Sequence, residues 1–143
     1  MKNAQSIFLC EMTGIWIAVV AWAIWPIDPP LQYLPGDMVT PDPVKEGGVI
    51  TVHRKIHVTR KEPVVVVRNL IRGNCVPECE IVDLPSSNIT VIPDAPRTQT
   101  REFVLPRTVE AGTWRLAFTY NWTDRIGRVH SETIPEIIFT VIK

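Results

Sequence analysis

Two patterns of apolar residues divide the chain. From Ile7 to Ile27 the sequence reads IFLCEMTGIWIAVVAWAIWPI, in which Glu11 is the single charge. Beyond residue 48, apolar residues instead come in short runs rich in Val, Ile and Thr. A helix of 21 residues rises about 31 Å, close to the roughly 30 Å of a bilayer's hydrocarbon core. The first pattern therefore predicts a transmembrane helix within residues 1–27 that contacts membrane lipid through residues 7–27.

The flanks of this run predict its end and its orientation. Trp22 and Trp25 lie near its far end, where indole rings favour the membrane interface, and prolines at positions 26, 29 and 30 then stop a helix. Lys2 precedes the run, while the first charges after it are Asp28 and Asp37. The positive-inside rule then predicts a single-pass membrane protein with its N-terminus in the cytoplasm. Its C-terminal part would be extracytoplasmic, in a periplasm or at a cell or virion surface.

Two other interpretations of the run remain open. Ala21-Trp22-Ala23 matches the A-x-A pattern of a signal-peptidase site, so the segment could be a cleaved signal peptide. It could also be a buried helix of a globular core. We favour an uncleaved signal anchor, because Glu11 interrupts the apolar region and bulky side chains surround the A-x-A site.

One stripe of the predicted helix carries Glu11, Gly14, Ala18 and Ala21. Small residues four positions apart let two helices approach closely, and a carboxyl group on the same stripe can bond to a partner helix. These four residues are the predicted helix-contact site. They make a homo-oligomer one of the expected assemblies.

The sequence between this run and residue 48 is rich in proline. Six prolines lie among residues 26–47, PIDPPLQYLPGDMVTPDPVKEG. Proline has no backbone N–H to donate and favours extended polyproline geometry. We therefore predict that residues 28–47 form an extended stalk.

After Gly48 the alternation of polar and apolar residues has a period of two, which predicts β-strands. In VITVHRKIHVTR, residues 49–60, Arg54 breaks the apolar face, so a bulge or an exposed edge is expected there. PVVVVRNLIR, residues 63–72, is apolar on both faces, as in a central strand. Further strands are predicted at 79–84, 88–92, 98–105, 112–121 and 128–142. A turn at Pro85-Ser86-Ser87 is expected to separate the first two, and Pro135 to split the last. Seven short strands in residues 48–143 predict an all-β sandwich.

One stretch of the predicted domain resembles a known family. In REFVLPRTVEAGTWRLAFTYNW, residues 101–122, a strand ends at Leu-Pro, a loop ends in Gly, and a strand with alternating aromatic residues follows. This pattern resembles the E–F corner of bacterial immunoglobulin-like domains and implies an immunoglobulin-like sandwich. Taken with the helix and the stalk, the chain is similar to small membrane-anchored proteins of bacteria and their phages, which implies a virion or envelope component.

Two of the three cysteines, Cys75 and Cys79, lie in GNCVPECE, residues 73–80. Thiols outside the cytoplasm are normally oxidised, and a tight turn at Pro77 can bring cysteines at i and i+4 within disulfide range. A metal site is an alternative, because Cys-x3-Cys resembles the start of the binuclear copper loop of oxidase subunits, and free thiols are another. The His and Met that continue that loop are missing here. We therefore predict a Cys75–Cys79 disulfide and no bound metal.

Charge and motifs argue against several classes of function. The chain carries 15 basic and 15 acidic residues, so its zero net charge does not favour nucleic-acid binding. The sequence has no G-x-S-x-G, no H-E-x-x-H and no glycine-rich phosphate loop. We therefore expect neither catalysis nor a cofactor.

Strand parity predicts the binding surface. If seven strands alternate in direction, the cysteine loop and the Asp124–Gly127 turn lie together at the membrane-proximal end, while the Leu105–Ala111 loop lies at the distal end. Another membrane or assembly protein would then contact residues 73–80 and 122–128. The predicted binding residues are Asn74, Val76, Pro77, Glu78, Glu80, Trp122, Asp124, Arg125 and Arg128.

The sequence thus predicts a non-catalytic, membrane-tethered extracytoplasmic binding or assembly module. The alternative is an extracytoplasmic metal or redox accessory domain that uses the Cys75/Cys79 loop. Only the alternative requires a bound thiophilic metal or a redox-active cysteine pair.

Overall fold

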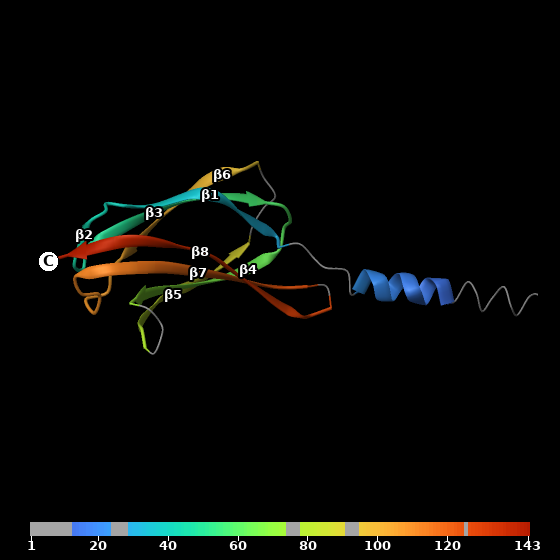
Figure 1. The fold of residues 1–143 in the computed structure, drawn as a ribbon. Helices are drawn as coiled ribbons and strands as arrows, with labels where there is room; N and C mark the ends of the chain where they lie inside the picture. Colours follow the sequence, from blue (N-terminus) through green and yellow to red (C-terminus); the bar gives the residue numbers. More distant parts are fainter. Residues whose placement is uncertain (1–12, 24–28, 74–77, 91–94, 125) are drawn as a thin grey trace, which may run out of the picture.

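A computed structural model of the chain describes residues 13–23, 29–73, 78–90, 95–124 and 126–143. Apart from one short helical segment, the described chain is all-β, with eight strands (Figure 1). The strands are β1 (Leu31–Thr40), β2 (Val44–Lys45), β3 (Val49–Val58), β4 (Pro63–Arg72), β5 (Glu80–Thr90), β6 (Arg97–Val104), β7 (Gly112–Thr123) and β8 (Val129–Ile142). They form a three-stranded sheet, β1-β3-β6, and a five-stranded sheet, β2-β8-β7-β4-β5. The predicted immunoglobulin-like sandwich of seven strands is therefore wrong; what the described residues show is an all-β fold with eight strands, the first of which begins at Leu31.

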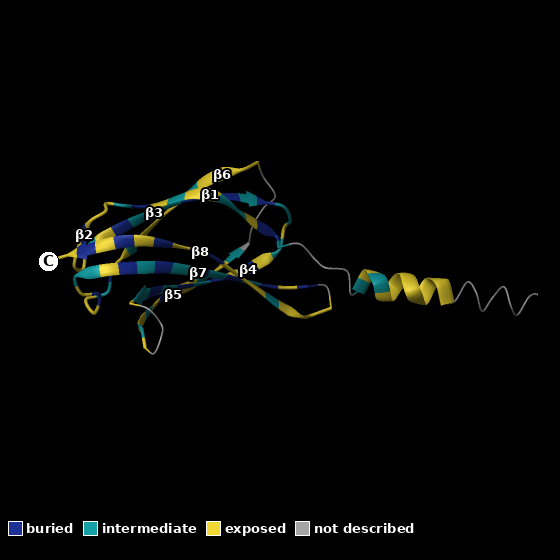
Figure 2. Cartoon of the chain, viewed as in Figure 1, coloured by how far each residue is buried: buried dark blue, intermediate teal, exposed yellow. Residues whose placement is uncertain are grey.

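Both sheets contribute side chains to one hydrophobic core (Figure 2). Along β3 and β7 every second residue is buried, as expected where one face of a strand packs inward and the other meets solvent. Trp114 of β7, Phe139 of β8 and Ile50 of β3 are almost completely buried. Each such side chain contributes roughly 1.5–3 kcal/mol of hydrophobic stabilisation.

The predicted stalk, residues 28–47, is corrected by β1 and β2. Leu31–Thr40 pairs antiparallel with β3, and Val44–Lys45 pairs parallel with β8. Proline is tolerated here because β1 and β2 are terminal strands of their sheets, where a missing N–H costs no ladder bond on the open side. The prolines of this segment therefore mark edge strands, and the expectation that they exclude strands is wrong.

An irregularity in β1 accommodates Pro35 and Gly36. The register between β1 and β3 shifts between Leu34 and Met38, as at a β-bulge. Gly36 has a φ of +115°, a backbone conformation that residues with a Cβ rarely adopt. A bulge was predicted at Arg54 of β3; the irregularity lies in β1, the strand that pairs with β3, opposite Arg54. Arg54 itself is 4% exposed in the middle strand of its sheet, so the predicted exposed edge is wrong.

Pro85 and Pro135, which were expected to divide strands, lie instead within continuous strands, at places where the pairing register shifts. The predicted strands 79–84 and 88–92 form the single strand β5, whose pairing with β4 shifts between Val66 and Arg68. Pro135 lies within β8, where the pairing with β7 shifts between Leu116 and Phe118. Joining the two predicted strands into one reverses the direction of every later strand relative to the prediction.

The N-terminal helical residues that the structure describes are 13–23. Eleven residues rise about 16 Å, roughly half the hydrocarbon thickness of a bilayer. Among the described residues no helix is long and apolar enough to cross a membrane. This finding contradicts the predicted transmembrane helix and the single-pass membrane location inferred from it. Within the described residues the physical reason is length: eleven helical residues are fewer than the roughly 20 that a transmembrane helix needs.

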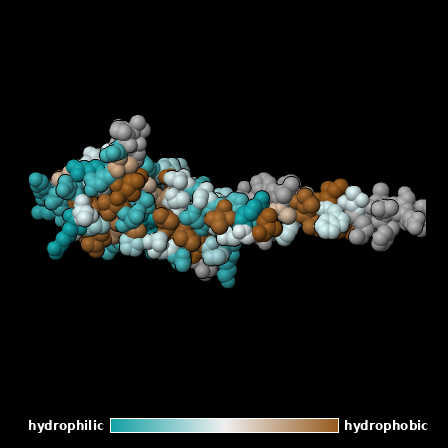
Figure 3. All heavy atoms as spheres, turned by 90° about the horizontal axis from the view of Figure 1, so that it is seen from below, coloured by the Kyte–Doolittle hydropathy of each residue, from teal (hydrophilic) through white to brown (hydrophobic). Residues whose placement is uncertain are grey.

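Apolar side chains of this helix are exposed, including Ile15, Trp16 and Ile17 (Figure 3). Within the predicted helix-contact site, Gly14 and Ala18 are exposed and Ala21 is half-buried, while Glu11 lies outside the described residues. Arg128 donates from Nη2 to the carbonyl oxygen of Ala23 at 3.2 Å. The last described turn of the helix is thereby joined to the chain that follows β7.

Candidate functional site: an arginine-lined groove between the sheets

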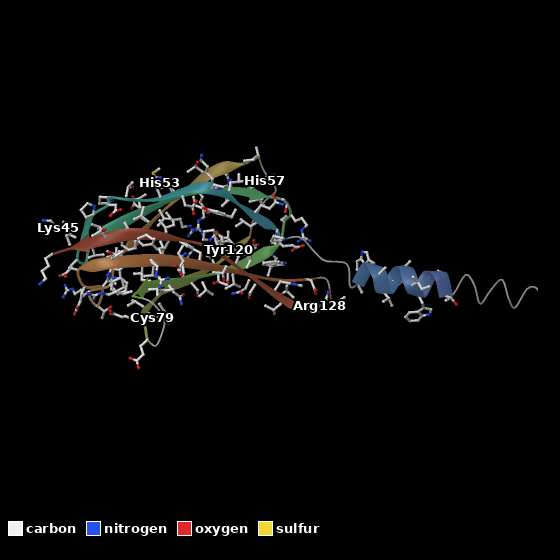
Figure 4. The ribbon with its side chains drawn as sticks, in the orientation of Figure 1. Lys45, His53, His57, Cys79, Tyr120 and Arg128 are labelled. Carbon is white, nitrogen blue, oxygen red and sulfur yellow. The ribbon has the colours of Figure 1, made fainter. Side chains whose placement is uncertain are left out.

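The structure does not bring the two predicted binding loops together. Arg115 donates to the carbonyl oxygen of Gly73 at 2.6 Å, and Arg72 donates to that of Ala111 at 3.0 Å. These bonds place the start of the cysteine loop beside the Leu105–Ala111 loop. Figure 4 shows Arg128 at the end of the sheets nearest the N-terminal helix and Cys79 well apart from it, below the other half of the sheets. Strand parity failed because β5 is one strand where two were predicted.

Several predicted site residues lie outside the described residues: Asn74, Cys75, Val76, Pro77 and Arg125. Cys79 is disulfide-bonded, while its partner is outside the described part of the chain, so the Cys75–Cys79 pairing stays a prediction. Glu78 and Glu80 are exposed, and Glu80 lies 3.6 Å from the Arg72 guanidinium. No group of three potential metal ligands occurs among the described residues.

The predicted residues of the β7–β8 turn form a closed hydrogen-bonded cluster around Asp124. Its Oδ1 accepts the backbone N–H groups of Ile126 and Arg128, at 3.0 and 2.8 Å. Its Oδ2 lies 2.7 Å from Arg128 Nε and 2.9 Å from His130 Nε2. Burial opposes ionisation of this carboxyl group, but the hydrogen bonds outweigh burial and hold the pKa of Asp124 well below its usual value. Since both oxygens are engaged within the turn, the carboxylate orders the hairpin.

Trp122 completes the same cluster. Its ring stacks on His130 with a centroid distance of 5.5 Å and an interplanar angle of 17°. Trp122 is 7% exposed, so little of its surface is available to a partner. Trp122 and Asp124 are therefore both buried in the described structure, and neither offers much surface to a binding partner.

A different set of polar residues lies inside the molecule, between the sheets. Arg54 of β3 and Arg68 of β4 enter from opposite sheets and are 4% and 3% exposed. Both occupy inward positions of alternating strands, where the pattern calls for an apolar residue. Buried charged groups are rare unless they are paired, so each needs an explanation.

Arg54 is neutralised by a carboxylate. Its Nε lies 2.5 Å from Asp37 Oδ2, and both side chains are 4% exposed. Asp37 also accepts the backbone N–H of Lys55, and it follows directly on the β1 bulge at Gly36. A bulge re-aims the side chains beside it, which explains why an edge-strand aspartate reaches the interior.

Neutral groups surround the rest of the Arg54 guanidinium. Nη1 donates to the hydroxyl oxygen of Tyr120 at 3.1 Å, and the Phe118 ring centroid is 3.7 Å from Cζ. Nη2 is buried and has no hydrogen-bond partner among the described residues. The cation is thus held by one ion pair, one hydroxyl and a close aromatic face.

Arg68 has no carboxylate partner among the described residues. Nη1 donates to the carbonyl oxygen of Pro85 and Nη2 to Ser87 Oγ, each at 2.7 Å. Nε is buried without a partner among the described residues. Burial, together with the positive charges of Arg101 and Arg54, lowers the pKa of Arg68. A guanidinium nevertheless stays protonated at neutral pH, so a desolvated positive charge remains there.

Arg68 lies where a small cavity and a larger groove meet. The cavity, of about 30 Å³, is lined by Arg54, Arg68, Arg101 and aromatic residues including Phe103 and Tyr120. The groove, of about 380 Å³, shares Arg68, Arg101 and Phe103 with the cavity. Its remaining lining residues are Leu84, Pro85, Ser86, Ser87, Glu102 and Val104. The groove therefore runs between β5 and β6, the terminal strands of the two sheets.

Arg101 supplies the exposed cation of the groove. It pairs across the ladder with Val52, a buried core residue of β3, so its side chain leaves β6 on the inward face. Because β6 is terminal, that inward position is exposed at the opening between the sheets. Three guanidinium groups thus converge near one buried carboxylate, and the site favours an anion.

Sequence reasoning missed this site, although one of its signals was visible. Arg54 stands out in the sequence as a break in an apolar face, but the expectation there was a bulge or an exposed edge. Arg68 falls in the apolar stretch VVVVRNLI, at a position that alternation with the buried Val64, Val66 and Leu70 assigns to the interior. Two arginines at inward strand positions indicate a buried polar site, but only the fold shows that they face each other.

Comparisons with known proteins extend the description of the fold. No family model matches the sequence, and no curated protein does. Among solved structures, the C-terminal domain of Wzt is 14% identical with a TM-score of 0.52, covering 81% of this chain and 75% of that one. The Pseudomonas fluorescens DNA glycosylase AlkC is 15% identical with a TM-score of 0.48, covering 82% of this chain and 32% of that one.

A third match is the Bordetella pertussis protein ApaA, which is 18% identical with a TM-score of 0.45 and covers 81% of this chain and 98% of that one. This chain therefore spans about a third of the glycosylase and most of the other two. The similarity to the Wzt domain is one of fold alone and does not indicate a function.

Proposed function

We propose that the chain is a non-catalytic binding module that holds an anionic group of its ligand in the groove between β5 and β6. The observation that carries this proposal is Arg68, a buried guanidinium with no carboxylate partner among the described residues and an unsatisfied Nε. A carboxylate or phosphate group in the groove would supply the missing counter-charge. Charge-assisted hydrogen bonds of this kind are roughly twice as strong as neutral ones.

The surroundings of Arg68 favour binding over catalysis. The residues that line the groove and the cavity include neither histidine, cysteine nor lysine. Ser86 and Ser87 line the groove, and Ser87 is hydrogen-bonded to Arg68. The carboxylate among the lining residues, Glu102, leaves β6 on the outer face, away from Arg68. The groove thus offers donors and charge for recognition, without a nucleophile and base in contact.

The test is an anion titration of the isotopically labelled full chain, at constant ionic strength. Acetate and inorganic phosphate are added separately, and the arginine Nε–H resonances are followed by NMR. Saturable shifts at Arg68 and Arg101 are expected, with Arg107 as the reference because it is exposed in the β6–β7 loop. Equal, non-saturating shifts at all three arginines would contradict the proposal.

A pair of variants sharpens this test. Arg101→Gln and Arg107→Gln remove the same charge from exposed positions, so neither is expected to disturb the fold. Only Arg101→Gln should weaken the saturable binding, by about tenfold for the loss of one charge-assisted contact. Equal weakening by both variants would show a general charge effect in place of a site.

A further inference from the structure

The free edge of β6 adds a second feature to the groove. β6 pairs with β3 on one side only, and no described strand pairs with its other edge. The backbone N–H of Leu105 donates to the carbonyl oxygen of Gly48 at 2.9 Å, in register with the β3–β6 ladder. This bond identifies which residues of β6 bond to β3, because hydrogen-bonded pairs alternate in an antiparallel ladder.

Arg101 and Phe103 therefore direct their backbone groups toward β3, and Glu102 and Val104 direct theirs toward the open edge. This assignment agrees with the groove lining, which includes Glu102 and Val104 although their side chains leave β6 on the outer face. Unpaired N–H and C=O groups of this kind are a template for a further strand.

The opposite wall of the groove does not offer a comparable template. Pro85 of β5 has no backbone N–H, and its carbonyl oxygen already accepts from Arg68. The register shift of β5 at this point also interrupts its regular backbone. An incoming strand would thus pair with β6 and lie against Pro85 and Leu84 through its side chains.

From these observations we infer that the groove takes an extended polypeptide segment of a partner protein as a fourth strand of the β1-β3-β6 sheet, with an acidic side chain facing Arg68 and Arg101. This inference rests on the proposed function and names its ligand. Alternate residues of an added strand face inward, beside the inward side chains of Arg101 and Phe103. The carboxylate of Glu102 lies on the outer face, so it does not oppose an inward acid.

The experiment uses the full chain and a pool of acetylated, amidated heptapeptides with a central glutamate and randomised flanks. A second pool carries N-methyl groups on the two peptide bonds next to the glutamate, which removes strand donors and keeps the charge. Selection on the immobilised chain is expected to enrich the first pool at least tenfold over the second. A third pool, with glutamine in place of glutamate, should be depleted to a similar degree.

Variants of β6 give an independent readout. Glu102→Pro deletes a backbone N–H that faces the groove, while Thr98→Pro deletes one on the same edge outside the groove lining. Glu102→Gln controls for the lost charge. Peptide affinity should fall about tenfold in Glu102→Pro only. Amide exchange at Glu102 and Val104 should slow when the peptide binds, whereas the exchange of Phe103 is already slow.

The outcomes separate the inference from the proposed function. If both glutamate pools bind equally and Arg101→Gln weakens both, the anion site stands and strand addition is wrong. Strand addition is also wrong if an anionic oligosaccharide such as oligogalacturonate binds in an Arg101-dependent way and no peptide does. If neither peptides, oligosaccharide nor free anions bind, both proposals fail.

Discussion

Arg54 and Arg68 enter the same interior from opposite sheets, yet their surroundings differ. Arg54 has a buried carboxylate at 2.5 Å and a phenyl ring at 3.7 Å, so its charge is compensated within the fold. Arg68 has two neutral oxygen acceptors and faces an open groove. Burial alone therefore does not distinguish a structural arginine from one available to a ligand; the presence of a counter-charge does.

The edges of the sheets account for this difference. On the Arg54 side, β1 lies along β3 and its bulge delivers Asp37 to the interior. On the Arg68 side, no described strand joins β5 to β6, and the groove lies in that gap. One end of the polar interior is thus closed by the chain itself, and the other is open to a partner.

The largest expected effect is that of Asp37→Asn. Removing the carboxylate leaves the Arg54 charge buried and uncompensated, which typically costs about 3–5 kcal/mol of unfolding free energy. Urea unfolding of the full chain measures it. The double variant Asp37→Asn, Arg54→Met should regain most of the loss, and a double variant as unstable as the single one would contradict the compensation argument.

Gly36→Ala is expected to have an intermediate effect. The added Cβ meets the flexible Lys55 side chain at an ordinary 3.5 Å, so the cost comes from the φ of +115° and should be about 1–2 kcal/mol. If the bulge serves to position Asp37, the losses from Gly36→Ala and Asp37→Asn should not add. A double-mutant cycle with additive losses would show that the bulge and the ion pair are independent.

Arg68→Met should change stability less than Asp37→Asn. The substitution removes a desolvated charge and leaves two neutral acceptors without a donor. One of them, the carbonyl oxygen of Pro85, belongs to an exposed residue, so we expect the unfolding free energy to change by about 1 kcal/mol or less. Saturable binding of acetate should be lost. A loss of stability as large as that of Asp37→Asn would mean that Arg68 is as structural as Arg54.

The smallest expected change in stability is that of Arg101→Gln. The residue is exposed, and its replacement should alter the unfolding free energy by less than about 0.5 kcal/mol. Anion binding should nevertheless weaken, so stability and binding separate at this position. Thermal unfolding with and without phosphate measures both quantities in the same sample, since a bound ligand raises the apparent stability.

Much of the strand pattern could be predicted, because one buried face imposes alternation along each strand. The regions of β3, β6 and β7 are recognisable from their period of two, and that of β4 from its continuous apolar run. Prolines caused the main errors: those near β1 and β2 favoured a stalk, and Pro85 favoured a break in β5. Proline excludes a backbone donor at one residue, and a strand can meet that requirement with an edge or a bulge.

The sequence by itself determined which residues alternate and that an arginine interrupts the apolar pattern of two strands. It did not determine that they converge, because their strands belong to different sheets and the distance between them depends on how the sheets face each other. It also did not determine which arginine has a counter-ion. Asp37 is 17 positions from Arg54 in the sequence, and it reaches Arg54 only because β1 pairs with β3 and has a bulge beside Asp37. Local alternation is encoded residue by residue, whereas charge compensation in a low-dielectric interior depends on contacts that only the folded chain creates.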